Sequence, residues 1–185
     1  ALTYFGEGAS NQGQVFESLN LAALFKLPCI FIIENNKYGM GTSVERASAS
    51  RDLSQNGAAW GIPGEQVNGM DVASVREAGE RAVAHCRAGK GPYLLEMKTY
   101  RYRGHSMSDP AKYRTREEVQ KMRETSDCIE TARKALLDDF GVTEADLKVI
   151  DDEVKAIVQD SADFAQESPE PPESELMTDI LVEVG

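Results

Sequence analysis

Two short apolar segments enclose a stretch of helical periodicity, and this arrangement limits the fold more than any other feature of the sequence. The apolar segments are residues 2–5 and 29–33, with Pro28 directly before the second. A helix between two strands is typical of a parallel strand pair. We therefore expect an α/β fold with a largely parallel sheet flanked by helices. The residues at helical spacing are Val15, Phe16, Leu19, Ala22, Ala23 and Phe25.

The pattern of strand after helix returns further along the chain. Asp71 is a good N-cap for a helix that runs to about Arg87, and residues 93–99 alternate well enough to form another strand. Residues 38–68 are rich in Gly, Ser, Ala and Asn and show no sustained period. We therefore expect a long loop region there, of the kind that is often functional.

The last part of the chain predicts a helical extension. A capping box at Thr115 to Glu118 starts one helix, and residues 128–140 and 143–165 have the pattern of two more. The third helix carries an apolar stripe, which we expect to cover an apolar surface. A Pro-rich stretch then ends the helices, and one more apolar run follows at Ile180 to Val184. The stripe consists of Leu147, Ile150, Val154, Ile157 and Phe164.

Charge is distributed unevenly and divides the chain in two. Residues 1–110 hold 11 Lys and Arg against 11 Asp and Glu, whereas residues 111–185 hold 9 against 20. The net charge of −11 argues against nonspecific nucleic-acid binding, and no apolar run is long enough to predict a membrane span. We predict an α/β region at 1–110 and an acidic helical extension at 111–185. A local basic group interrupts this pattern, formed by Lys98, Arg101, Arg103, Lys112, Arg114 and Arg116.

Polar loops follow the first two predicted strands. Gly6-Glu7-Gly8 ends the first strand and Asn35-Asn36 ends the second. Ligands of open parallel sheets bind at the carboxyl ends of strands, and the first loop also leads into a helix N-terminus, which favours anions. Carboxylate and amide oxygens are ligands that Mg²⁺ prefers. We therefore expect a Mg²⁺–diphosphate site, with simple turns as the alternative for each loop alone.

These loops, together with residues 100–110, resemble a known family. Gly6-Glu7-Gly8 followed by an Asn pair is similar to the thiamine diphosphate motif, in which Asp usually stands at the position of Glu7. Residues 11–14, 34–43 and 100–110 resemble, more specifically, the alpha subunits of the pyruvate dehydrogenase component of the pyruvate dehydrogenase complex. The resemblance runs from about Ala1 to the Pro-rich tail and covers only the later part of such a subunit.

The resemblance implies roles for individual residues. Glu7 and Asn36 would give side-chain oxygens to Mg²⁺, and Tyr38 its main-chain carbonyl. Gly6, Gly8 and Ala9 would lie at the cofactor diphosphate.

A second set of implied roles lies in other loops. His105 matches the loop histidine that lies beside the cofactor and assists transfer of the acetyl group to lipoamide, the alternative being a solvated loop histidine. Ser106 and Ser43 match positions that are phosphorylated in mitochondrial members, although they can equally be unmodified serines. Ala111-Lys112-Tyr113 stands where the family has a further phosphorylation site.

The implied activity is the thiamine diphosphate- and Mg²⁺-dependent oxidative decarboxylation of pyruvate, which links glycolysis to acetyl-CoA. The implied partners are a beta subunit, in an α₂β₂ heterotetramer, and the lipoyl domain of dihydrolipoamide acetyltransferase. Two alternatives remain open. One is the alpha subunit of an acetoin or branched-chain 2-oxo acid dehydrogenase, and the other is a noncatalytic nucleotide- or diphosphate-binding module.

The first residue, Ala1, stands almost inside an apolar strand, so we expect a soluble fragment whose upstream part is missing and which is inactive alone. Three cysteines, Cys29, Cys86 and Cys128, have unrelated spacings, which favours buried thiols in a reducing compartment. We expect a cytoplasmic protein if the source is bacterial, which we favour, or a mitochondrial matrix protein if it is eukaryotic.

Overall fold

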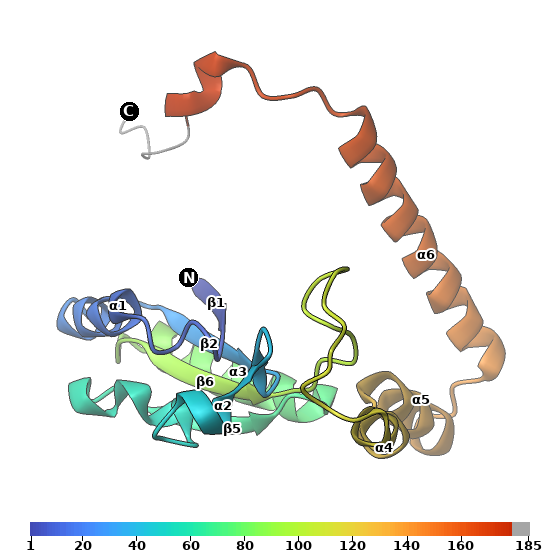
Figure 1. The fold of residues 1–185 in the computed structure, drawn as a ribbon, viewed down its shortest axis with the longest axis horizontal. Coiled ribbons are helices and arrows are strands. Elements are labelled where there is room, and N and C mark those ends of the chain that lie inside the picture. The colour runs from blue at the N-terminus through green and yellow to red at the C-terminus, as the bar shows by residue number, and fades with distance from the viewer. Residues whose placement is uncertain (179–185) are drawn as a thin grey trace. The chain divides into compact units, whose positions relative to one another are not determined.

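The structure, a computed structural model, describes residues 1–178 (Figure 1). It divides into two compact units, Ala1–Lys134 and Ala135–Gly185. The apolar run at Ile180 to Val184 lies outside the described residues.

The first unit is built on a parallel four-stranded sheet with the strand order β1-β2-β6-β5. Every neighbouring pair is parallel, and β1 and β2 are adjacent. The sheet and its flanking helices confirm the predicted α/β fold. The strands are β1 (Leu2–Gly6), β2 (Ile30–Asn35), β5 (Gly64–Asn68) and β6 (Tyr93–Lys98).

Helices cover both faces of the sheet, as Figure 1 shows. On one face, α1 (Gly13–Leu24) and the 3₁₀ helix η1 (Leu53–Trp60) pack on alternate residues of β2 and β6, such as Ile33 and Leu94. On the other face, α3 (Val72–Arg87) packs on Ile32 and Leu95. Asp71 caps α3 as predicted, because its side chain accepts the Ala73 N–H at 3.0 Å.

The prediction of a long loop over residues 38–68 was wrong in part. This region contains a small hairpin of β3 (Tyr38–Gly39) and β4 (Thr42–Ser43), the short helix α2 (Val44–Ala47), η1 and strand β5. Strand β5 lies at the sheet edge, and Val67 is its one buried residue. An edge strand with a single buried apolar side chain leaves almost no alternating pattern in the sequence.

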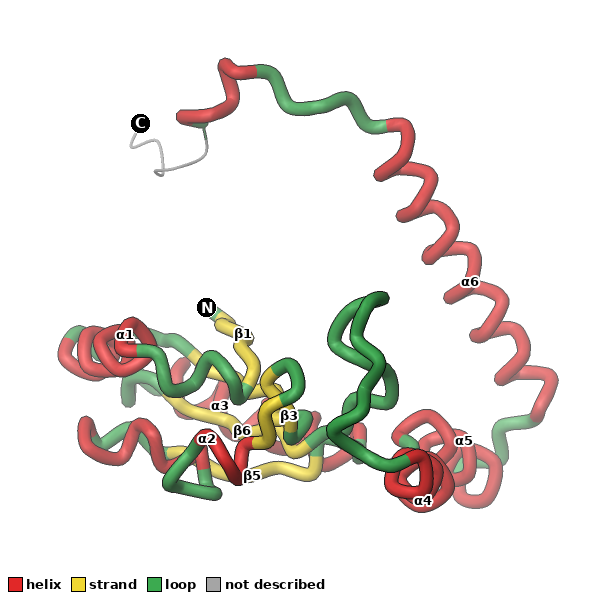
Figure 2. The backbone as a smooth tube through the Cα atoms, in the orientation of Figure 1, coloured by secondary structure: helices red, strands yellow, loops and turns green. Residues whose placement is uncertain are grey.

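Residues 99–115 form a long loop without helix or strand, as predicted and as Figure 2 shows in green. Three helices follow, namely α4 (Arg116–Ser126), α5 (Cys128–Asp139) and α6 (Glu144–Glu167), and then the 3₁₀ helix η2 (Glu173–Met177). Thr115 accepts the Glu118 N–H at 3.1 Å, which gives the predicted cap of α4.

The apolar stripe of α6 is largely exposed, and its expected packing on an apolar surface stays a prediction. The exposed fraction is 52% for Ile150 and Val154, 68% for Ile157 and 74% for Phe164. Within residues 1–178, no helix combines the length and the apolar character needed to cross a bilayer.

Candidate functional site

The predicted polar loops leave the sheet side by side. Gly6 at the end of β1 pairs with Glu34 of β2, and Asn35 pairs with Lys98 at the end of β6. The carboxyl ends of these strands therefore form one edge. The loops after β1, β2 and β6 all start at this edge.

Glu7 is the central acidic group of this edge. Its residue is only 4% exposed, and its Oε2 accepts the backbone N–H of Asn36 at 3.1 Å. Its other oxygen, Oε1, is buried and has no hydrogen-bond partner among the described residues. A buried carboxylate oxygen without a partner is costly, so this atom is a candidate ligand for a cation.

The first loop and the β3–β4 hairpin touch through two glycines. A Cβ atom on Gly39 would lie 2.9 Å from the Cα of Gly8, and a Cβ on Gly8 would lie 3.0 Å from the Cα of Gly39. Real side chains do not come this close to backbone, so both positions need glycine to keep the loops together. The contact brings together the residues that precede the two glycines, Glu7 and Tyr38, in one site.

Backbone hydrogen bonds fix the shape of the first loop. The buried Ser10 hydroxyl donates to the carbonyl of Glu7 at 2.7 Å, and the Ala9 N–H donates to the carbonyl of Gly6 at 3.0 Å. The Ala9 N–H is thus already used inside the loop. In contrast, Gln12 makes no side-chain cap at the start of α1. The N-terminal amides of α1 therefore have no side-chain acceptor from their N-cap, which suits an anion.

The other two predicted metal ligands already accept one hydrogen bond each. Asn36 Oδ1 accepts the N–H of Tyr38 at 3.3 Å, and the Tyr38 carbonyl accepts Arg101 Nη1 at 3.2 Å. Each of these oxygens keeps a second lone pair. Together with Glu7 Oε1 they form an all-oxygen donor set of the kind that suits Mg²⁺. The donor chemistry of these residues therefore fits the ion, which Glu7, Asn36 and the Tyr38 carbonyl would hold.

Asn35, the first residue of the Asn pair, turns into the protein instead. It is 1% exposed, its Nδ2 donates to Glu96 Oε1 at 2.6 Å and its Oδ1 accepts the Lys37 N–H at 3.0 Å. Glu96 is fully buried on β6. Sequence reasoning missed Glu96, although a lone carboxylate inside an apolar strand is itself a signal of a specific role.

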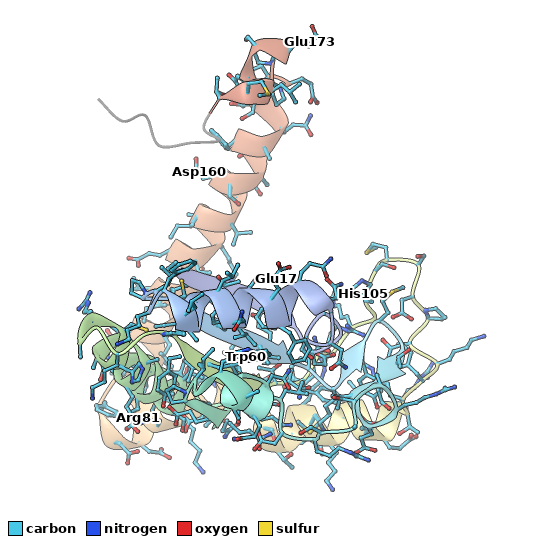
Figure 3. The ribbon with its side chains drawn as sticks, turned by 90° about the vertical axis from the view of Figure 1, so that its left-hand side faces the viewer. Glu17, Trp60, Arg81, His105, Asp160 and Glu173 are labelled. Carbon is cyan, nitrogen blue, oxygen red and sulfur yellow. The ribbon has the colours of Figure 1, made fainter. Side chains whose placement is uncertain are left out.

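The long loop after β6 carries His105, which is exposed (Figure 3). Asp109 holds the loop in shape, because its carboxylate accepts the His105 N–H at 2.7 Å and the Ala111 N–H at 2.8 Å. These bonds, the one from His105 above all, lower the pKa of Asp109 below its ordinary value. Tyr113 also donates to Asp109 Oδ2, at 2.9 Å.

The two serines predicted as modification sites lie in different segments. Ser106 is exposed on the long loop and its hydroxyl lies 3.1 Å from that of Ser108. Ser43 is the half-buried N-cap of α2. Among residues 1–178, no group of three or more His, Cys, Asp or Glu side chains is placed to hold a metal ion, so the candidate Mg²⁺ site has only one carboxylate, that of Glu7.

Comparison with known proteins gives the same family along nearly the whole chain. The family model described as "Dehydrogenase E1 component" matches residues 1–174. The chain is 65% identical over 182 residues to the pyruvate dehydrogenase E1 component subunit alpha of Rhizobium meliloti, covering 98% of this chain and 52% of that protein.

Two further relatives carry related names. Identity is 56% over 179 residues to the subunit alpha of Zymomonas mobilis, covering 97% of this chain and 50% of the relative. It is also 56% over 176 residues to the somatic, mitochondrial form of Homo sapiens, covering 95% and 45%. The chain thus spans about half the length of the curated relatives that it matches.

Proposed function

The chain belongs to the dehydrogenase E1 component family, and on that premise we propose that it forms the diphosphate-binding part of the alpha subunit of a thiamine diphosphate-dependent pyruvate dehydrogenase. The single observation that carries the proposal is the buried, unpartnered Oε1 of Glu7 at the edge where three loops leave the sheet. The high identity to relatives named as pyruvate dehydrogenase supports the choice of substrate.

Each loop has a distinct task in this proposal. Glu7, Asn36 and the Tyr38 carbonyl hold Mg²⁺. Gly6 and Gly8 keep the first loop close to the diphosphate, while Ala9 shares its N–H with the Gly6 carbonyl. The uncapped start of α1 gives the diphosphate an electropositive helix end.

His105 acts beside the cofactor. When bound, thiamine diphosphate supplies the carbanion and the electron sink that decarboxylation of a 2-oxo acid requires. His105 is exposed on a loop anchored by Asp109, so its imidazole can hold or release a proton during acetyl transfer to a lipoyl group. Our proposal assigns no other residue of this chain as a base for this step.

The remaining parts of the proposal concern the assembly. We expect a beta subunit in an α₂β₂ heterotetramer, and the lipoyl domain of dihydrolipoamide acetyltransferase as acceptor.

We keep the division into an α/β region at 1–110 and an acidic extension at 111–185. The relatives include bacterial proteins and a mitochondrial form, so the compartment follows from the source organism.

The test uses a Glu7→Gln variant of the full-length subunit together with its beta subunit. Gln keeps the size of the side chain and an oxygen for the Asn36 N–H, but it removes the negative charge. Thiamine diphosphate binding is titrated with Mg²⁺, and we expect the half-saturating Mg²⁺ concentration to rise about tenfold or more. Glu17→Gln, on the surface of α1, is the matched control. Unchanged Mg²⁺ dependence in Glu7→Gln would remove Glu7 from the metal site.

Substrate comparison separates the alternatives. Turnover of pyruvate by the reconstituted enzyme should exceed that of acetoin and of branched-chain 2-oxo acids. The absence of thiamine diphosphate-dependent CO₂ release from every one of these would favour a noncatalytic diphosphate-binding module.

Phosphorylation is a second, separate proposal for the loops of the site. Ser106 is exposed and lies next to His105, so a phosphate of about −1.5 to −2 charge there would repel a bound diphosphate. Ser43 is half-buried at a helix start and is the less accessible of the two. Incubation of the full subunit with a mitochondrial kinase and mass spectrometry would test both, and no label at Ser106 would end the idea.

A further inference from the structure

Glu96 is a buried carboxylate to which none of the proposed functions gives a task. It lies on β6, is 0% exposed, and accepts five hydrogen bonds. Five donors surround its two oxygens, so the side chain is held in place by its neighbours. The segments that supply the five donors determine which parts of the chain Glu96 can hold in place.

The two oxygens of Glu96 serve different parts of the molecule. Oε2 accepts the backbone N–H groups of Leu53 at 2.8 Å and Ser54 at 3.1 Å, and the amide of Gln66 at 2.8 Å. These donors belong to η1 and β5, which form the scaffold. Oε1 accepts Asn35 Nδ2 at 2.6 Å and Lys98 Nζ at 3.2 Å, both at the edge of the sheet where the site lies.

The side chain of Asn35 connects Glu96 to the turn at Lys37. Its Nδ2 is held by Glu96, so its Oδ1 is fixed in the direction from which Lys37 donates its N–H at 3.0 Å. Lys37 has a φ of 77°, in the left-handed region that a residue with a side chain seldom adopts. A bond to its N–H therefore selects this unusual turn. Asn36 and Tyr38 stand on either side of it.

We propose that Glu96 is a positioning residue that sets the Asn36–Tyr38 turn through the side chain of Asn35. Its role at the metal rests on the proposed function, because Asn36 and Tyr38 are the ligands assigned there. The role at the turn rests only on the hydrogen bonds, which do not depend on any ligand.

The hydrogen-bond donors and acceptors of Glu96 and Asn35 allow a specific test by exchanging them. In Glu96→Gln, the new amide oxygen is needed by the three scaffold donors, so its NH₂ faces the NH₂ of Asn35. Asn35 can escape only by rotating, and its NH₂ then faces the Lys37 N–H. In either case one bond of the Asn35 side chain is lost, and Lys98 Nζ also loses its acceptor. In the double variant Glu96→Gln with Asn35→Asp, one Asp oxygen accepts from the new amide and the other accepts from Lys37.

Hydrogen–deuterium exchange at the Lys37 amide of the full-length subunit, assembled with its beta subunit and without ligands, measures the effect on the turn. We expect exchange to rise about tenfold in Glu96→Gln and to return to within about twofold of wild type in the double variant. Gln66→Met is the matched control, because it removes a donor to Glu96 Oε2 and a bond to the Arg51 carbonyl but leaves the bonds of Glu96 Oε1 in place. An equal rise in the control, or no recovery in the double variant, would overturn the proposal.

A second variant covers the case in which Glu96→Gln does not fold. Asn35→Ala leaves the three scaffold bonds of Glu96 in place and cuts only the connection to the loop. Because the variant also deletes Asn35 Oδ1, the acceptor of the Lys37 N–H, exchange at Lys37 should rise at least as much as in Glu96→Gln, and a fully protected Lys37 amide would refute the role of the connection.

The metal arm uses thiamine diphosphate binding titrated with Mg²⁺. The half-saturating Mg²⁺ concentration should rise several-fold in Glu96→Gln and recover in the double variant. An unchanged value in a Glu96→Gln variant with faster exchange would refute the influence on the metal ligands. If wild type bound no thiamine diphosphate at all, the proposed function would fall, while the exchange data would still decide whether Glu96 sets the turn.

Discussion

Arg101 donates a hydrogen bond to the main-chain carbonyl of Tyr38 at 3.2 Å, across 63 positions of sequence. The same guanidinium donates to the carbonyl of Met40 at 2.6 Å and to the Tyr113 hydroxyl at 2.9 Å. Arg101 therefore joins the long loop after β6 to the hairpin after β2. The ring centroids of Tyr38 and Tyr113 lie 5.0 Å apart, so the two rings add an apolar contact between the loop and the hairpin.

Removing the guanidinium should loosen both segments together. We expect Arg101→Met to speed hydrogen–deuterium exchange in residues 38–43 and in residues 101–113, because it deletes three hydrogen bonds at once. Arg103→Met removes the same charge from an exposed side chain that makes none of these bonds, so it should change little. A faster hairpin with an unchanged long loop would show that Arg101 does not couple them.

The contact of Gly8 with Gly39 predicts a cost for any side chain there. Gly39→Ala places a Cβ 2.9 Å from backbone, which cannot move aside as a flexible side chain can. We expect a loss of about 1–3 kcal/mol in the free energy of unfolding, and weaker Mg²⁺-dependent thiamine diphosphate binding. Thermal unfolding and the Mg²⁺ titration measure the two effects.

The control for this substitution is Gly79→Ala within α3, where a Cβ meets nothing within 4 Å. It should keep both stability and binding, because alanine suits a helix better than glycine does. Equal effects of the two substitutions would contradict the close approach of the loops.

The strands, helices and helix caps that depend on residues close together in sequence were predicted correctly. β1, α1 and β2 follow from apolar periodicity, and Asp71 and Thr115 cap helices as their residue types indicate. Strand β5 was missed because it buries only Val67.

The contacts within the site could not be predicted in the same way. Arg101 with Tyr38 and Glu96 with Leu53 join residues that are far apart in sequence, and nothing in either segment alone indicates its partner. The positions of Glu7 and Asn36 at one edge were predictable, since both follow neighbouring parallel strands. The burial of Asn35 against Glu96 was not.

His105 should affect turnover but not folding. It is exposed, and its backbone N–H rather than its ring makes the bond to Asp109. We expect His105→Ala to lower kcat with a lipoyl acceptor about 10²-fold or more, which is typical for loss of a group that transfers protons. The melting temperature should stay the same. Met107→Ala, in the same loop and fully exposed, should keep wild-type turnover, and a His105→Ala enzyme that also did so would rule out a catalytic role.

Protonation of Asp109 at low pH should make the long loop less ordered. Its pKa lies below the ordinary value of 3.8, chiefly because the charged form accepts the His105 N–H. A carboxyl group with a lowered pKa in the folded state stabilises that state above its unfolded pKa, and this stabilisation is lost as the pH falls through the folded pKa. The loop should therefore keep its shape from pH 7 down to about pH 4 and loosen below that.

Asp109→Asn should reproduce the acid effect at neutral pH. One amide oxygen cannot replace the two carboxylate oxygens that accept from His105 and Ala111, so at least one of these bonds is lost. We expect about fivefold faster exchange of these two amides at pH 7, after correction for the intrinsic exchange rate, and little further change on acidification. Glu117→Gln alters an exposed carboxylate in the first turn of α4 and should leave both amides as they are. If Asp109→Asn kept the pH profile of the wild type, another group would have to hold the loop, because the only difference between the two proteins is the carboxylate that the profile is meant to titrate.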